Sequence, residues 1–158
     1  MTIKLKVEGF REIERALLAL PSGTAKGIAR RAMRKELQPI ADMANSLWPG
    51  KSRDVFRITS RLDRRQRRDS QQIRGNSVLN LFVGATSGKD GHNEAHLLEF
   101  GTGPRFTRNG AFRGAISPRP MLQPAWDAHK AGLLPGLGNR LWEEIRKTII
   151  RRERRAGR

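Results

Sequence analysis

The sequence contains no cysteine among its 158 residues. This absence excludes a disulfide framework, a thiol nucleophile, an iron–sulfur cluster and a zinc site built on thiolates. Any metal would have to be held by histidine and carboxylate side chains, and the sequence has only three histidines. A chain of this length folds as one domain with a hydrophobic core, so its stability does not require covalent or metal cross-links.

Long apolar runs are also missing from the sequence. No stretch approaches the roughly 20 apolar residues that a membrane-spanning helix requires. Residues 1–10 alternate charged with apolar side chains, which differs from the apolar core of a secretory signal peptide. We therefore expect a soluble protein that is made in the cytoplasm.

Acidic residues are scarce relative to basic ones. The chain has 15 Asp and Glu against 32 Lys and Arg, which gives a formal net charge of +17. Most carboxylates have basic sequence neighbours, and the sequence contains neither a Gly-x-Ser-x-Gly turn nor a P-loop. We therefore expect no enzymatic activity and no cofactor. The charge itself points to phosphate backbones, acidic protein surfaces or anionic membranes as partners.

One histidine pair has the spacing of metal ligands. His92 and His96 are four residues apart and Glu99 follows three further on, so on a helix all three side chains would face one way. A zinc-protease helix has its general-base Glu directly after the first His, and this chain has Asn93 at that position. We therefore interpret His96 as a packing or capping residue and predict no metal site.

Hydrophobic periodicity in the first third of the chain predicts a strand and two helices. Alternation over residues 2–8 indicates an opening strand, and helical spacing from Phe10 indicates a short helix that Pro21 ends. A longer helix follows, with Ser22 or Thr24 as its cap. It extends to Trp48, and its inner Pro39 is expected to kink or split it.

The middle of the chain is predicted to hold short strands between polar segments. Residues 55–62 can form an anchored turn or strand. Residues 64–72 are almost wholly polar and are predicted to form an exposed loop or arm. Residues 78–86 alternate as a strand does, and residues 94–100 form a short apolar element. Residues 101–117 form a long loop rich in Gly and Arg, and loops of that length are usually functional or ordered by a partner.

Two helices are predicted at the C-terminal end. The first runs from about Pro120 to Lys130, and we expect its Leu122 and Trp126 to pack on the strand at residues 78–83. Glycines and a proline over residues 132–138 are expected to break it before a terminal helix starts. The whole is an α+β fold: a small mixed or antiparallel sheet packed against a long N-terminal helix and C-terminal helices, with long basic loops.

Arginine concentrates in two clusters of the form RRxRR. The clusters comprise Arg64, Arg65, Arg67 and Arg68, and Arg151, Arg152, Arg154 and Arg155. The arginine side chain forms bidentate hydrogen bonds with phosphate or carboxylate groups, so both clusters are candidate contacts to DNA or to an acidic partner. The alternative is that both clusters are solvated surface. Base-reading side chains with interleaved aromatics are missing, so DNA contact would be independent of sequence. We divide the chain into a single domain over residues 1–150 and a basic tail over residues 151–158.

Three segments together resemble a known family. They are Val7-Glu8-Gly9-Phe10 before a helix, Ala95-His96-Leu97-Leu98-Glu99-Phe100-Gly101-Thr102, and Pro118-Arg119-Pro120-Met121-Leu122-Gln123-Pro124-Ala125-Trp126 before the final helices. Their order and spacing resemble the HK97 gp10-like family of tailed-bacteriophage neck and tail-completion proteins. The resemblance covers nearly the whole chain, and the second and third segments are its specific part.

The resemblance implies a non-enzymatic structural protein of the virion. It implies a homo-oligomeric ring, of six subunits, between the head-side connector or stopper and the tail terminator or tail tube. On this basis we expect a set of residues to contact subunits or neighbouring rings: Glu99, Thr102, Arg105, Phe106, Phe112 and Arg119. The lumen of a neck passes genomic DNA, so the Arg clusters could face either DNA or an adjacent ring. Two alternatives remain open, a tail terminator that caps the tube and a free nucleic-acid-binding protein without sequence preference.

Overall fold

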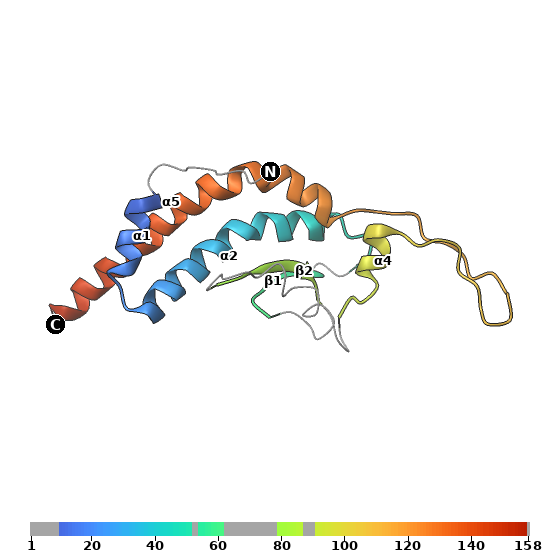
Figure 1. Cartoon of the computed structure of the whole chain (residues 1–158), viewed down its shortest axis with the longest axis horizontal. Helices are drawn as coiled ribbons and strands as arrows, with labels where there is room; N and C mark the ends of the chain where they lie inside the picture. The colour runs from blue at the N-terminus through green and yellow to red at the C-terminus, as the bar shows by residue number, and fades with distance from the viewer. Residues whose placement is uncertain (1–9, 52–53, 62–78, 87–90, 158) are drawn as a thin grey trace.

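The computed structural model describes residues 10–51, 54–61, 79–86 and 91–157 of the chain (Figure 1). Within these residues it confirms the α+β class, with four helices and one two-stranded antiparallel sheet. The elements are α1 (Phe10–Leu18), α2 (Ser22–Ser46), β1 (Phe56–Thr59), β2 (Phe82–Ala85), α4 (Ala95–Phe100) and α5 (Leu122–Ala156). The predicted strand over residues 2–8 and the first Arg cluster lie outside the described residues.

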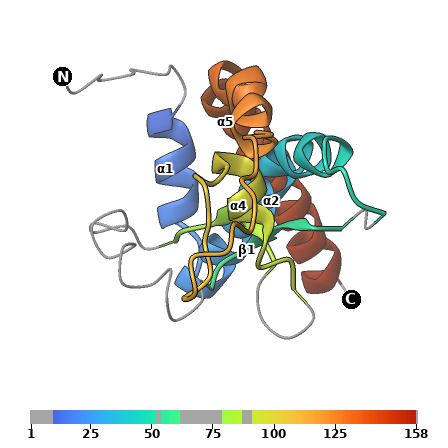
Figure 2. The ribbon, with the colours of Figure 1, turned by 90° about the vertical axis from the view of Figure 1, so that its right-hand side faces the viewer.

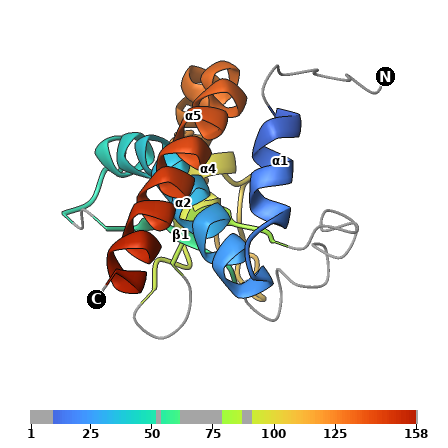
Figure 3. The same ribbon diagram turned by 90° about the vertical axis from the view of Figure 1, so that its left-hand side faces the viewer.

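The two long helices α2 and α5 run antiparallel along the body (Figure 1). Three ion pairs link the two helices. Arg31 Nε donates to Glu144 Oε2 at 2.8 Å, Lys35 Nζ donates to Glu144 Oε1 at 2.6 Å, and Arg140 Nε donates to Glu36 Oε2 at 2.7 Å. Figures 2 and 3 view the molecule along its long axis from opposite ends and show α1 to one side of this pair.

The hydrophobic core forms two clusters along the helix pair. The first joins the C-terminal half of α2 to β1, α4 and the start of α5, through Ile40, Ala44, Val55, Phe56, Ala95, Met121 and Ala125. The second joins α1 to the N-terminal half of α2 and the later turns of α5, through Ile13, Ile28, Ala32, Leu141 and Ile145. Alanine at four of these positions lets the helix backbones approach closely.

The predicted break over residues 132–138 is wrong, because α5 is one helix of 35 residues that contains Pro135. Pro135 has no backbone N–H, so the carbonyl one turn earlier in the helix loses its hydrogen-bond donor. Pro135 is exposed, so water can reach this carbonyl. The neighbouring glycines lie where α5 meets other helices. A Cβ at Gly136 would collide with the carboxylate of Glu36, and one at Gly138 would come within 3.3 Å of the Phe10 ring. Tertiary packing therefore overrides local helix-breaking tendencies.

The predicted split at Pro39 and the predicted cap of α2 need correction. Helix α2 continues through Pro39 as one helix, so the split is wrong, and the kink stays a prediction. Pro39 is exposed, so the lost backbone hydrogen bond falls on the solvent side of the helix. Neither Ser22 nor Thr24 caps the helix through its side chain; residue Pro21 holds the cap position, and its carbonyl accepts the Ala25 N–H at 3.0 Å.

The small sheet is attached to the end of α2 by one side chain. Strand β1 pairs with β2 in the register Phe56 to Ala85 and Thr59 to Phe82. Asn45 Oδ1 accepts the backbone N–H groups of Val55 and Phe56, each at 2.8 Å, and Asn45 Nδ2 donates to the Phe56 carbonyl at 2.9 Å. The predicted strand over residues 78–86 is confirmed only for residues 82–85.

Trp126 is not the core residue that we expected. Its neighbours Met121 and Ala125 are buried, and Leu122 packs against the first core cluster together with Val83. Trp126 itself points to the surface and is 45% exposed. We therefore expect a smaller loss of stability from Trp126→Ala than the 3 to 5 kcal/mol, roughly, that a buried tryptophan would cost.

Candidate functional site

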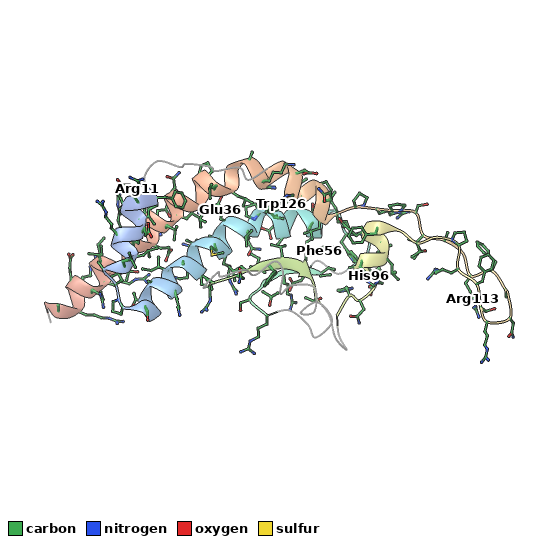
Figure 4. The ribbon with its side chains drawn as sticks, in the orientation of Figure 1. Arg11, Glu36, Phe56, His96, Arg113 and Trp126 are labelled. Carbon is green, nitrogen blue, oxygen red and sulfur yellow. The ribbon has the colours of Figure 1, made fainter. Side chains whose placement is uncertain are left out.

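A β-ribbon arm, residues 101–119, projects from the body between α4 and α5 (Figures 1 and 4). Its two sides pair at two isolated bridges, Thr102 with Ile116 and Phe106 with Phe112. The Thr102 N–H donates to the Ile116 carbonyl at 2.9 Å, and the Thr102 hydroxyl accepts the Ile116 N–H at 3.1 Å. The long loop predicted here is therefore an ordered hairpin.

Local hydrogen bonds close the tip of the arm. The Thr107 N–H donates to the Ala111 carbonyl at 2.8 Å, and the Thr107 hydroxyl accepts the Ala111 N–H at 3.0 Å. Gly110, at φ 78°, supplies the left-handed conformation that the turn needs. At the base, Gly101 has φ 71°, and a Cβ there would meet the Ile116 carbonyl at 2.7 Å. Only glycine fits at this hinge between α4 and the arm.

The arm is strongly exposed and cationic. Phe106 and Phe112 are 62% and 64% exposed, with ring centroids 5.6 Å apart. The arm carries four arginines and no acidic residue. Figure 4 shows Arg113 on the part of the arm that lies far from the body. Side chains of this kind gain favourable contacts only when another surface covers them.

Glu99 joins the arm to the body. Its Oε2 accepts the N–H groups of Met121 and Leu122 at 2.7 and 3.1 Å, and its Oε1 accepts that of Gln123 at 2.9 Å. A carboxylate at this place satisfies free N–H groups at the start of α5 and interacts favourably with the helix dipole. Glu99 thus has an intrachain role that the sequence analysis missed, and its role in subunit contact stays a prediction.

A groove opens beside the base of the arm, with a volume of about 680 Å³. We call it the α4–α5 groove. Its lining is mostly apolar and comes from α2, β2, α4 and the start of α5, including Leu37, Val83, His96, Phe100 and Trp126. Phe100 is 79% exposed. Figure 4 labels His96 on α4 and Trp126 on α5, at the end of the body from which the arm extends.

The two histidines near the groove differ in their surroundings. His96 is exposed on α4, and Glu94 holds the cap position of that helix, so the predicted packing or capping role of His96 is wrong. His92 Nδ1 lies 3.1 Å from Glu94 Oε1, and the His92 ring packs edge-on against Trp48 at a centroid distance of 5.3 Å. Glu99 is bound to the start of α5. Among the residues that the structure describes, no group of three His, Asp or Glu side chains converges as metal ligands would.

The second Arg cluster lies on the last turns of α5, which continue to Ala156. All four of its arginines are exposed. This helical end projects beyond α1 and α2 (Figure 3). Helix α5 therefore continues into the segment that we expected to be a basic tail, residues 151–158. No helix in the described ranges is long and apolar enough to cross a membrane.

The structure brings most of the predicted contact residues together. Five of them lie on the arm: Thr102, Arg105, Phe106, Phe112 and Arg119. Glu99 lies on α4 at the base of the arm, where the Arg119 N–H donates to the Leu98 carbonyl at 2.7 Å. The cluster at Arg151 lies at the opposite end of the body (Figure 1). The apolar groove was not predicted from the sequence, where Phe100 next to Gly101 is the local pattern that points to it.

No protein-family model, curated protein or solved structure matches the chain in comparisons with known proteins. The arm, the groove and the arginine clusters are therefore interpreted from their own geometry and chemistry.

Proposed function

We propose that the chain is a structural subunit of a tailed-bacteriophage virion, a neck or tail-completion protein that forms a ring and joins the head-side connector to the tail tube. The observation that supports this best is the projecting arm with its exposed aromatic and arginine side chains. A lone two-stranded hairpin is marginally stable in water. An arm of this composition is suited to contacting another subunit, and it offers no arrangement for catalysis.

The arm and the body are different surfaces of one chain. If the arm of each copy binds the body of the next copy, the contact is heterologous, and such contacts form a ring when the rotation between copies closes. Two copies that exchange arms reciprocally would instead form a closed two-fold dimer. In the proposed neck, a ring of six copies has the head connector or stopper on one side and the tail terminator or tube on the other. The chain is made in the host cytoplasm and then resides in the virion.

A stop codon in the gene for this chain tests the proposal in the phage that encodes it. We expect DNA-filled heads and unattached tails by negative-stain electron microscopy, and joined particles when the intact chain is supplied from a plasmid. Tails of irregular length would instead favour a terminator that caps the growing tube. Joined, infectious particles that lack the chain would contradict both assignments.

The arginine cluster on α5 supports a second candidate, a free protein that binds nucleic acid without sequence preference. If the four exposed arginines neutralise about four phosphates, affinity for any duplex should fall roughly a hundredfold between 50 and 200 mM salt. Replacing Arg151, Arg152, Arg154 and Arg155 with Gln should remove most of this salt dependence in fluorescence-anisotropy titrations. An unchanged affinity and slope would show that the cluster is only a solvated surface.

The same variant, placed in the phage, distinguishes two positions of the cluster within the proposed neck. If the cluster faces the DNA channel, heads and tails of the variant still join but DNA retention falls. If the cluster contacts an acidic face of an adjacent ring, heads and tails of the variant fail to join. Strong duplex binding together with normal particles in the stop-codon experiment would favour the free nucleic-acid-binding protein.

A further inference from the structure

Strongly exposed aromatic side chains occur at two places in the described part of the chain. Phe106 and Phe112 form a pair near the end of the arm, which we call the aromatic tip. Phe100 and Trp126 lie on the α4–α5 groove. Monomeric proteins rarely leave large apolar patches uncovered, so two such patches on one small chain point to an interface.

We propose that the aromatic tip of one copy docks into the α4–α5 groove of the next copy. This inference rests on the proposed function, because it names the contact through which the copies of the proposed ring join. The occupant of the groove is thus a segment of the same chain, and each copy supplies one tip and one groove.

The groove has the size and the lining that the tip requires. A volume of about 680 Å³ lies inside the range of roughly 300 to 1,000 Å³ that holds compact apolar ligands. Two phenylalanine side chains bring roughly 300 to 500 Å² of surface that burial would remove from water. The aromatic rings of Phe100 and Trp126 can receive them edge to face, as aromatic pairs prefer.

Charge also favours this occupant. The arm carries Arg105, Arg108, Arg113 and Arg119 and has no carboxylate. The described lining of the groove contains no Lys or Arg, although the chain has 32 of them among 158 residues. The exposed carboxylates that adjoin lining residues in the sequence already have partners in the same chain, Glu94 with His92 and Asp127 with Lys130. The groove lining itself therefore offers little electrostatic repulsion to a cationic arm.

A chain does not fill its own groove with its own tip. The arm begins at Gly101, next to Phe100 on the groove, and runs away from the body (Figure 1). The bridges at Thr102 and Phe106 hold this stretch extended, so the tip lies on the order of 13 Å beyond the base. The exposure of Phe106 and Phe112 shows that the groove of the same chain does not cover them.

Cysteine cross-linking tests the contact cleanly, because the natural chain has no cysteine. One protein carries Asn109→Cys on the arm and a second carries His96→Cys on the groove. We expect a short flexible bismaleimide to link them into dimers only when the two are mixed, and to link a chain with both substitutions into a ladder of multimers. Ser22→Cys, exposed at the far end of α2, replaces His96→Cys in the control and should give no dimer.

Three outcomes of the cross-linking would overturn the inference. Dimers from Asn109→Cys alone would show that arms contact arms. An internal cross-link confined to monomers of the doubly substituted chain would show that the arm folds onto its own groove. The absence of any mixed product, in concentrated purified protein and in particles alike, would show that the aromatic tip does not dock in the α4–α5 groove.

Removing the aromatic tip gives an independent measurement. We expect Phe106→Ser with Phe112→Ser to leave the circular dichroism spectrum and Tm of the subunit unchanged and to abolish multimers in native mass spectrometry. Leu18→Ser removes a side chain that is 77% exposed on α1 and should leave the multimers intact. Multimers of unchanged size in the tip variant would contradict the inference. Because the stop-codon experiment does not depend on the arm, failure of the contact and failure of the proposed function are distinguishable.

Discussion

Replacing Glu99 with alanine is expected to lower the free energy of unfolding by about 2 to 4 kcal/mol, one of the two largest effects that we predict. The substitution removes a carboxylate that accepts three backbone N–H groups at the start of α5. Met121, which donates one of them, is almost fully buried, so water does not readily replace the lost acceptor. Urea titration of the purified subunit measures the difference.

Glu99→Gln separates the loss of hydrogen bonds from the loss of side-chain volume at this position, and Glu94→Gln serves as the control. Glu99→Gln keeps one acceptor oxygen in the same place and should lose about half as much stability as Glu99→Ala. Glu94→Gln changes an exposed carboxylate just before α4 and should have a small effect. A Glu99→Ala subunit as stable as the natural one would show that Glu99 acts at the surface of the assembly instead.

The second large effect is expected at Glu144, where substitution by glutamine should cost about 2 to 3 kcal/mol at neutral pH. The Glu144 side chain is only 5% exposed and is held between Lys35 and Arg31 of α2. Their hydrogen bonds, that of Lys35 first, lower the pKa of Glu144 to about 2 from its usual 4.5. Glu143→Gln is the matched control, since Glu143 is exposed and pairs with Lys147 only at 3.8 Å.

The lowered pKa also predicts how the Glu144 contribution depends on pH. A carboxyl group whose pKa is lower in the folded state stabilises the fold above its unfolded pKa, and this stabilisation is lost as pH falls toward the folded pKa. The stability difference between the natural chain and Glu144→Gln should therefore be full above about pH 5 and should shrink between pH 4.5 and pH 2. A difference that stays constant over this range would show that the ion pairs contribute nothing.

Local patterns in the sequence identified the short-range elements of the fold. The helix from Phe10 and the long helix after Pro21 follow from apolar spacing and from breaker residues at their ends. The element over residues 94–100 was predicted only as short and apolar, and the structure shows that it is the helix α4. The continuity of α5 did not follow. Glycines break helices in isolation, but here Gly136 and Gly138 leave room for Glu36 of α2 and Phe10 of α1 against α5.

The candidate site was predictable in its position more than in its shape. Residues 101–117 were predicted to be a contact segment because the loop is too long for a plain connector and contains phenylalanine and arginine. The pairing of the two sides of the arm at its bridges was not predicted, because no short sequence pattern encodes it. The role of Glu99 depends on N–H groups more than 20 residues away, and Glu144 finds its partners more than 100 residues away. Such contacts carry no local signal in a single sequence.

Cryo-electron microscopy of the neck of the intact particle tests the central proposal most directly. The proposal predicts a closed ring of copies of this chain between the head connector and the tail tube, with the arm of each copy lying on the α4–α5 groove of its neighbour. A neck whose density is fully accounted for by other proteins, or one that holds this chain as a single isolated copy, would contradict it.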